Sequence, residues 1–205
     1  FAVNMYNDPD IQDEFCLLQI KPMVIGGLLE TEYLLLNEEE EILCKSNMVL
    51  GDGIIDTIHN IICVNIDEFD QSITRNIAKE IEVFNRQLGR DNPYLLIGPG
   101  RWGTADPWLG IPVNWRQISH AKVIVEVGMD DLNPEPSFGS HFFQNVTSLR
   151  VGYFTLQHID KGGELDTEWL NNQTIKQATK FIRWILLDNP LCIRIDGSTG
   201  EGVIL

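Results

Sequence analysis

The residues best suited to bind an anion begin with GPGRWG, residues 98–103, which follows the apolar run YLLI. Gly98, Gly100 and Gly103 leave backbone N–H groups uncovered, Arg101 adds a guanidinium, and Trp102 and Trp108 can wall a pocket. The stretch lacks the lysine and hydroxyl of a P-loop. Its glycines have the G-x-G-x-x-G spacing, but DPW, residues 106–108, predicts a second turn after them in place of the helix that a nucleotide-binding motif opens. It therefore predicts either an anion-binding loop or a rigid corner at the end of a central strand, with Trp102 and Trp108 packed on the sheet.

A second candidate stretch is FGSHFFQN, residues 138–145. If Ser140 caps a short helix, His141 stands in its first turn, where the helix dipole lowers the pKa of an imidazole. Gln144 follows one turn later on the same face. This stretch follows the strand after the glycine loop, so two parallel neighbouring strands would bring Arg101 and His141 to one rim of the sheet. We expect a shared anion pocket there, with a purely structural role as the alternative.

The remaining histidines, glycine-rich residues and cysteines are predicted to have structural roles. The four histidines do not pair at the spacing of metal ligands, so no metal site is predicted. The glycine-rich IDGSTGEG, residues 195–202, carries acids where a phosphate loop needs a lysine, which favours a hairpin turn. The four cysteines lie in apolar runs without a C-x-x-C pair, which is typical of buried reduced thiols.

The elements that must position these residues follow from hydrophobic periodicity. A helix is predicted from apolar residues at steps of three and four, ended by Gly89. These residues are Ile73, Ile77, Ile81, Phe84 and Leu88. Strands are predicted at IICVNI, PYLLIG, KVIVEV and VGYFTL, with FIRWILL and LCIRI as two more on either side of DNP. The fold class expected is α/β or α+β, a mixed sheet with flanking helices.

The composition limits the function classes. Thirty acidic and fifteen basic residues give a formal net charge of −15, which disfavours nucleic acid and anionic membranes as partners. No apolar stretch approaches the roughly 20 residues needed to span a bilayer. The chain shows no signal-peptide pattern and both its ends look cut, so we interpret it as a fragment of a longer cytoplasmic protein.

The first residues resemble a known family. Phe1-Ala2-Val3 and FCLLQIKPM are similar to the last hairpin of the ATP-grasp nucleotide-binding domain in the pyruvate phosphate dikinase and phosphoenolpyruvate synthase family. Gln19 and Lys21 fall on that motif's Gln and Arg positions and Pro22 follows. The resemblance thus implies that Gln19 and Lys21 contact the nucleotide. Lysine keeps the charge but loses the bidentate fork of arginine.

Two later stretches extend the resemblance. LLIGPGRWGTADPWLGIPV and GSHFFQN are similar to the carboxyl-terminal region of large bacterial phosphoenolpyruvate synthase-like, or PEP/pyruvate-binding, proteins. ISHAKVIV, around His120, is similar to the phosphohistidine carrier motif of this family. It lacks the preceding glycine pair and has Ile118 in place of Thr, so an ordinary histidine before a strand is predicted.

The resemblance implies a function and a domain organisation. Residues 1–25 would be the terminal hairpin of the nucleotide-binding domain, and residues 26–205 an accessory α/β domain with one compact core. The parent would be an ATP-dependent phosphotransferase that makes phosphoenolpyruvate from pyruvate, using ATP and Mg²⁺ that this fragment does not bind alone. Its partners would be the upstream nucleotide-binding domain and a small-molecule substrate. The alternative is a non-catalytic module that binds an anion or docks another domain. No catalytic residue is assigned.

Overall fold

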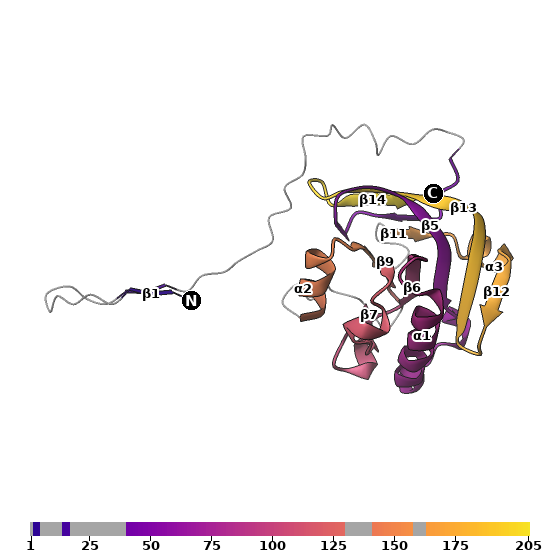
Figure 1. The fold of residues 1–205 in the computed structure, drawn as a ribbon, viewed down its shortest axis with the longest axis horizontal. Helices are drawn as coiled ribbons and strands as arrows, with labels where there is room; N and C mark the ends of the chain where they lie inside the picture. The colour runs from indigo at the N-terminus through magenta and orange to yellow at the C-terminus, as the bar shows by residue number, and fades with distance from the viewer. Residues whose placement is uncertain (1, 5–13, 17–39, 130–140, 158–162) are drawn as a thin grey trace, which may run out of the picture.

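A computed structural model describes residues 2–4, 14–16, 40–129, 141–157 and 163–205 (Figure 1). A mixed sheet of ten strands curls into a half-barrel, and three α-helices pack with it among the described residues. This confirms the expected fold class. None of the helices in the described ranges is long and apolar enough to cross a membrane.

Four neighbouring parallel strands form the centre of the sheet. They are β5 (Gly53–Val64), β6 (Tyr94–Pro99), β9 (Ala121–Val127) and β10 (Gly152–Leu156). Every residue of β6 and β10 is buried, as expected for strands covered on both faces. The apolar runs YLLIG, KVIVEV and GYFTL therefore form strands as predicted.

Antiparallel strands extend the sheet from both sides of this centre. Next to β5 come β13 (Ile182–Asp196), β14 (Glu201–Ile204), β3 (Cys44–Ser46) and β11 (Gly163–Leu165), while β12 (Ile175–Ala178) also pairs with β13 and β4 (Val49–Leu50) pairs with β10. FIRWILL and LCIRI belong to one strand, β13, and not to the two strands that were predicted. The register against β5 shifts between Leu186 and Leu191, so DNP is accommodated as an irregularity in a continuous strand.

The sheet curls because one short segment joins its two sides. β3 pairs with β14, whereas β4, only two residues later, pairs with β10. The Ser46 hydroxyl donates to the backbone oxygen of Thr155 at 2.7 Å, and the Thr155 N–H donates to Met48 O at 2.9 Å. These contacts hold the β14 side and the β10 side of the sheet together.

Helices cover one face of the sheet, which we call the helix face. α1 (Thr74–Leu88) buries Ile77, Ile81, Phe84 and Leu88, and Gly89 ends it with a φ of +68°, as predicted. α2 (His141–Ser148) packs on the same face, and β7 (Arg101–Trp102) lies between the two helices in Figure 1. α3 (Thr167–Asn172) instead packs Leu170 against the opposite face of the sheet, which we call the inner face.

The remaining short elements are β8 (Gly110–Ile111) and the 3₁₀ turns η2 (Ile66–Glu68), η3 (Gln71–Ile73), η4 (Pro107–Leu109) and η5 (Trp115–Gln117).

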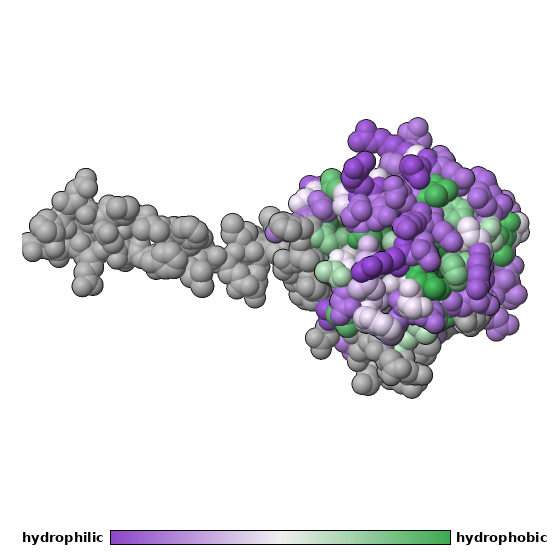
Figure 2. All heavy atoms as spheres, turned by 90° about the horizontal axis from the view of Figure 1, so that it is seen from below, coloured by the Kyte–Doolittle hydropathy of each residue, from purple (hydrophilic) through white to green (hydrophobic). Residues whose placement is uncertain are grey.

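The buried apolar residues form two clusters, one on each face of the sheet. Tyr94 and Leu96 point to the helix face, whereas Leu95 and Ile97 point to the inner face, as the alternation of a strand requires. The surface seen in Figure 2 is mostly polar, with small separate apolar areas.

The amino-terminal residues that the structure describes form a hairpin. β1 (Ala2–Asn4) pairs antiparallel with β2 (Glu14–Cys16), with Val3 opposite Phe15. This confirms the predicted pair of strands. Gln19 and Lys21 lie outside the described residues, so their nucleotide contacts stay a prediction.

Candidate functional site

The GPGRWG stretch forms a tight corner after β6. β7 turns away from the sheet and pairs in parallel with β8. The two backbones come so close that a Cβ at Gly110, whose φ is +152°, would lie 2.2 Å from both N and O of Arg101. A Cβ at Gly100, with a φ of +68°, would lie 2.9 Å from Leu109 O. Only glycine fits at these two positions.

The corner uses its own backbone donors. The Gly100 N–H donates to Val127 O at 2.9 Å, the Trp102 N–H to Glu126 Oε1 at 2.9 Å, and the Gly103 N–H to Ile111 O at 3.0 Å. This corrects the expectation that the N–H groups of Gly100 and Gly103 are uncovered for a ligand. The donors are satisfied internally because the corner itself must be folded against β9.

The tryptophans of this region have different roles. Trp102 is 3% exposed, and its indole N–H donates to Val125 O at 3.1 Å. A Cβ at Gly98 would lie 2.6 Å from the Trp102 ring, so the ring covers the strand at that glycine. Trp108 is 62% exposed and does not pack on the sheet, contrary to expectation, because η4 turns it toward solvent.

Beneath the corner lies a buried carboxyl group that sequence reasoning missed. Glu126, near the end of β9, is 1% exposed. Its Oε1 accepts hydrogen bonds from the Trp102 N–H and from the Tyr153 hydroxyl on β10. Its Oε2 is buried and accepts no hydrogen bond from a described group. Thr155, its register partner on β10, lies on the same side. The sequence signal was a single acid inside the apolar run KVIVEV.

Burial and the neighbouring groups shift the pKa of Glu126 in opposite directions. Burial raises the pKa of this carboxyl to about 7. The hydrogen bonds from Tyr153 and Trp102, the positive charge of Arg101 and the nearby Thr155 side chain lower the pKa, but less strongly. The Tyr153 hydroxyl has a pKa well above its ordinary value, mainly because it is buried and also because Glu126 is near. Glu126 therefore changes charge close to neutral pH.

Arg101 is the cation at this corner. Trp102 points into the core, so its neighbour Arg101 faces the other way on β7 and is half-exposed. No described carboxylate forms an ion pair with Arg101 within 4.0 Å. Its charge nevertheless lowers the pKa of both Glu126 and Tyr153. The guanidinium is thus near the buried carboxyl without being neutralised by it.

The second predicted stretch lies beside this corner. β6 and β9 are parallel neighbours, with Pro99 opposite Val127, which confirms the arrangement required for a common rim. A Cβ at Gly103 would lie 2.3 Å from the ring of Phe142, so the first turn of α2 packs against the corner. His141 begins α2, but its side chain lies outside the described residues. The pocket shared by Arg101 and His141 stays a prediction. Gln144 is exposed.

The other candidate residues have structural partners. His120 Nδ1 lies 3.0 Å from Asn85 O, and its backbone N–H donates to Asn85 Oδ1, which fits an ordinary histidine held against α1. In IDGSTGEG, Asp196 Oδ1 accepts from the N–H groups of Ser198 and Thr199, forming the predicted hairpin turn between β13 and β14. Within the described ranges, no group of three or more His, Cys, Asp or Glu could hold a metal ion.

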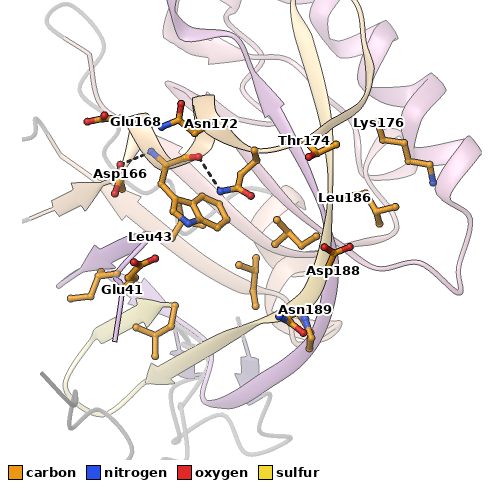
Figure 3. Close-up of a pocket in the computed structure, with 17 residues that line it drawn as sticks. Glu41, Leu43, Asp166, Glu168, Asn172, Thr174, Lys176, Leu186, Asp188 and Asn189 are labelled. Carbon is orange, nitrogen blue, oxygen red and sulfur yellow. Dashed lines mark hydrogen bonds between the residues drawn. The ribbon is translucent and has the colours of Figure 1, made fainter. Parts of the chain in front are cut away.

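A groove of about 1060 Å³ lies near α3 and the irregular part of β13 (Figure 3). Trp169 stands in its wall, its N–H bound to Asp166 and its carbonyl oxygen to the Gln173 amide. Four acids line the groove with one cation: Glu41, Asp166, Glu168, Asp188 and Lys176. The sequence does not predict this groove, because DNP indicates a break between two separate strands.

Comparisons with known proteins found no matching family model, no matching curated protein and no matching solved structure.

Proposed function

We propose that the α/β unit of residues 40–205 binds a small anion, a carboxylate or a phosphate, at the rim formed by the carboxyl ends of β6, β9 and β10. The observation that carries this proposal is Arg101, a half-exposed guanidinium without a described ion-pair partner. Open sheets bind ligands outside the carboxyl ends of their parallel strands. In a chain with twice as many acids as bases, an arginine that no described carboxylate pairs with is suited to a ligand of opposite charge.

The rigidity of the corner supports the same proposal. Trp102 is fixed by hydrogen bonds from its backbone N–H and its indole N–H, so the backbone that carries Arg101 is fixed too. A cation on a preorganised backbone loses less conformational entropy when it binds a ligand.

We further propose that the parent protein is a phosphoenolpyruvate synthase-like phosphotransferase. The hairpin of β1 and β2 supports this proposal because the resemblance places such a hairpin there. Gln19 and Lys21 would hold the nucleotide, and ATP with Mg²⁺ would supply the phosphoryl group. The anion bound at the rim would then be pyruvate, phosphoenolpyruvate or phosphate.

Calorimetric titration of the 205-residue chain with pyruvate and with sulfate tests the anion site. We expect saturable binding that Arg101→Gln weakens by about 1.5–3 kcal/mol, the usual value of a charge-assisted hydrogen bond. The matched control is Arg116→Gln on η5, an exposed arginine away from the corner, which should bind like the parent chain. Equal losses in both variants would reduce the effect to net charge and refute the site.

The phosphotransferase proposal is tested in the full-length protein by measuring ATP- and pyruvate-dependent formation of phosphoenolpyruvate. Lys21→Ala should lower kcat/KM for ATP by about 10- to 150-fold, corresponding to the same range of free energy. Unchanged ATP kinetics would show that LLQIKPM is not the nucleotide-binding strand.

A further inference from the structure

The unsatisfied oxygen of Glu126 carries an inference about how the rim selects its ligand. Oε1 is fully engaged by the Trp102 N–H and the Tyr153 hydroxyl. Oε2 is enclosed, and although the nearby Thr155 side chain lowers the pKa of the carboxyl, no described group lies in hydrogen-bonding geometry to this oxygen. A buried polar atom of this kind is costly to leave without a partner. Because both donors are on Oε1, a proton on the carboxyl resides on Oε2.

We propose that Glu126, protonated on Oε2, donates a hydrogen bond to one oxygen of an oxyanion that Arg101 attracts, so that the site takes up one proton when it binds its ligand. This inference rests on the proposed anion site and adds its ligand class and its regulation. The proton comes from solvent and stays on the carboxyl, and no covalent bond is made or broken. An ionised Glu126 would repel the same ligand.

The groups facing Glu126 permit this role. From β10 come the Tyr153 hydroxyl and the uncharged Thr155, from the corner comes Arg101, and β6 presents Gly98 without a side chain. The sequence of α2 contains no charged residue apart from His141, whose side chain lies outside the described residues. The donors to Oε1 keep the carboxyl oriented in either protonation state. Burial raises its pKa to about 7, which leaves the protonated form well populated near neutral pH.

The test is the pH dependence of the dissociation constant for sulfate and for pyruvate, two probes that do not titrate between pH 6 and pH 8.5. In the unsubstituted 205-residue chain we expect the Kd to be constant below the pKa of Glu126 and to rise about tenfold per pH unit above it. Titrations at pH 8 in two buffers of different ionisation enthalpy should show uptake of about one proton per ligand, as linkage requires.

The matched variant is Glu126→Gln, which keeps the oxygen that accepts from Trp102 and Tyr153 and offers an N–H in place of the Oε2 proton. Its Kd should be independent of pH. A ¹³C titration of the Glu126 carboxyl in the parent chain, without and with saturating sulfate, should show its pKa rising in the complex. This readout does not require the variant to fold.

The outcomes separate the two proposals. Binding that does not vary with pH, or that varies equally in Glu126→Gln, would overturn the role of Glu126 and leave the anion site standing; equal variation would point to His141. Absence of saturable binding of either probe at any pH would overturn the anion site and this inference together.

Discussion

The stability of the fold should fall as the pH rises through the range in which Glu126 ionises. The perturbation is Glu126→Gln, which removes the ionisation and keeps the acceptor for Trp102 and Tyr153. The folded state raises the pKa of Glu126 from 4.5 to about 7, so between these values it binds more protons than the unfolded chain. In the unsubstituted chain, the stabilisation that Glu126 provides through its raised pKa is therefore complete below pH 4.5 and is lost by pH 7.

The magnitude follows from the shift. A pKa raised from 4.5 to about 7 corresponds to about 3 kcal/mol between the two protonation states. The free energy of unfolding of Glu126→Gln, taken relative to the parent, should thus increase by about 3 kcal/mol between pH 4.5 and pH 7.5.

Urea unfolding at a series of pH values measures this difference, with midpoints and slopes fitted for each variant. Subtracting the parent from the variant removes the titration of the other acids. The exposed Glu201 on β14 provides the control, because Glu201→Gln makes the same chemical change at the surface and leaves the interior unaltered. A difference between parent and Glu126→Gln that stays flat, or that falls with pH, would show that the hydrogen bonds to Oε1 and the charge of Arg101 outweigh burial, and our account of Glu126 would be wrong.

The corner and its support on α1 give two more predictions. Gly110→Ala should destabilise the fold by about 3 kcal/mol or more, because its Cβ would lie 2.2 Å from the β7 backbone. Gly89→Ala, with a φ of +68° and a ψ of −174° but open space around it, should cost less, about 1–2 kcal/mol, because only its backbone conformation is strained; similar urea midpoints for the two would contradict the close contact. Asn85→Ala should cost about 2–4 kcal/mol, since Asn85 accepts from the Tyr94 hydroxyl and the His120 N–H and donates to Arg116 O. Asn76→Ala, on the exposed side of α1, is its control, and an equal effect on thermal unfolding would refute the role of Asn85.

Periodicity predicted much of the scaffold because it reports local burial. The spacing of Ile77, Ile81, Phe84 and Leu88 sufficed for α1, since one apolar stripe needs only one surface to pack against. The continuity of β13 was not predictable from DNP alone. It depends on pairing with β5, where Trp184 lies opposite Ile62, more than a hundred residues away in the chain.

The candidate site, too, was only partly predictable from local sequence. The glycines of GPGRWG indicated a special backbone, and the sequence left open whether a ligand or a neighbouring strand required it. The structure shows the neighbour, because Gly110 lies against the backbone of Arg101. Glu126 was not recognised because an acid in KVIVEV is unremarkable until Tyr153, on the next strand, closes over it. Interactions between strands far apart in the chain are not encoded in any local pattern.

The pairing of β3 with β14 has a consequence for how the protein is made. Cys44 lies opposite Ile204, and the Leu43 N–H donates to Ile204 O at 2.9 Å. β3 can therefore complete its pairing only after β14 has been synthesised. At a synthesis rate of about 10 residues per second, roughly 160 residues take on the order of 15 seconds to emerge. Such long-range pairing also slows folding, because loop closure precedes the contacts that reward it. During this interval the edge of β3 has no β14 to pair with, and unpaired edges promote association between chains. Nascent chains paused before residue 201 should therefore depend on chaperones more than chains that already include β14.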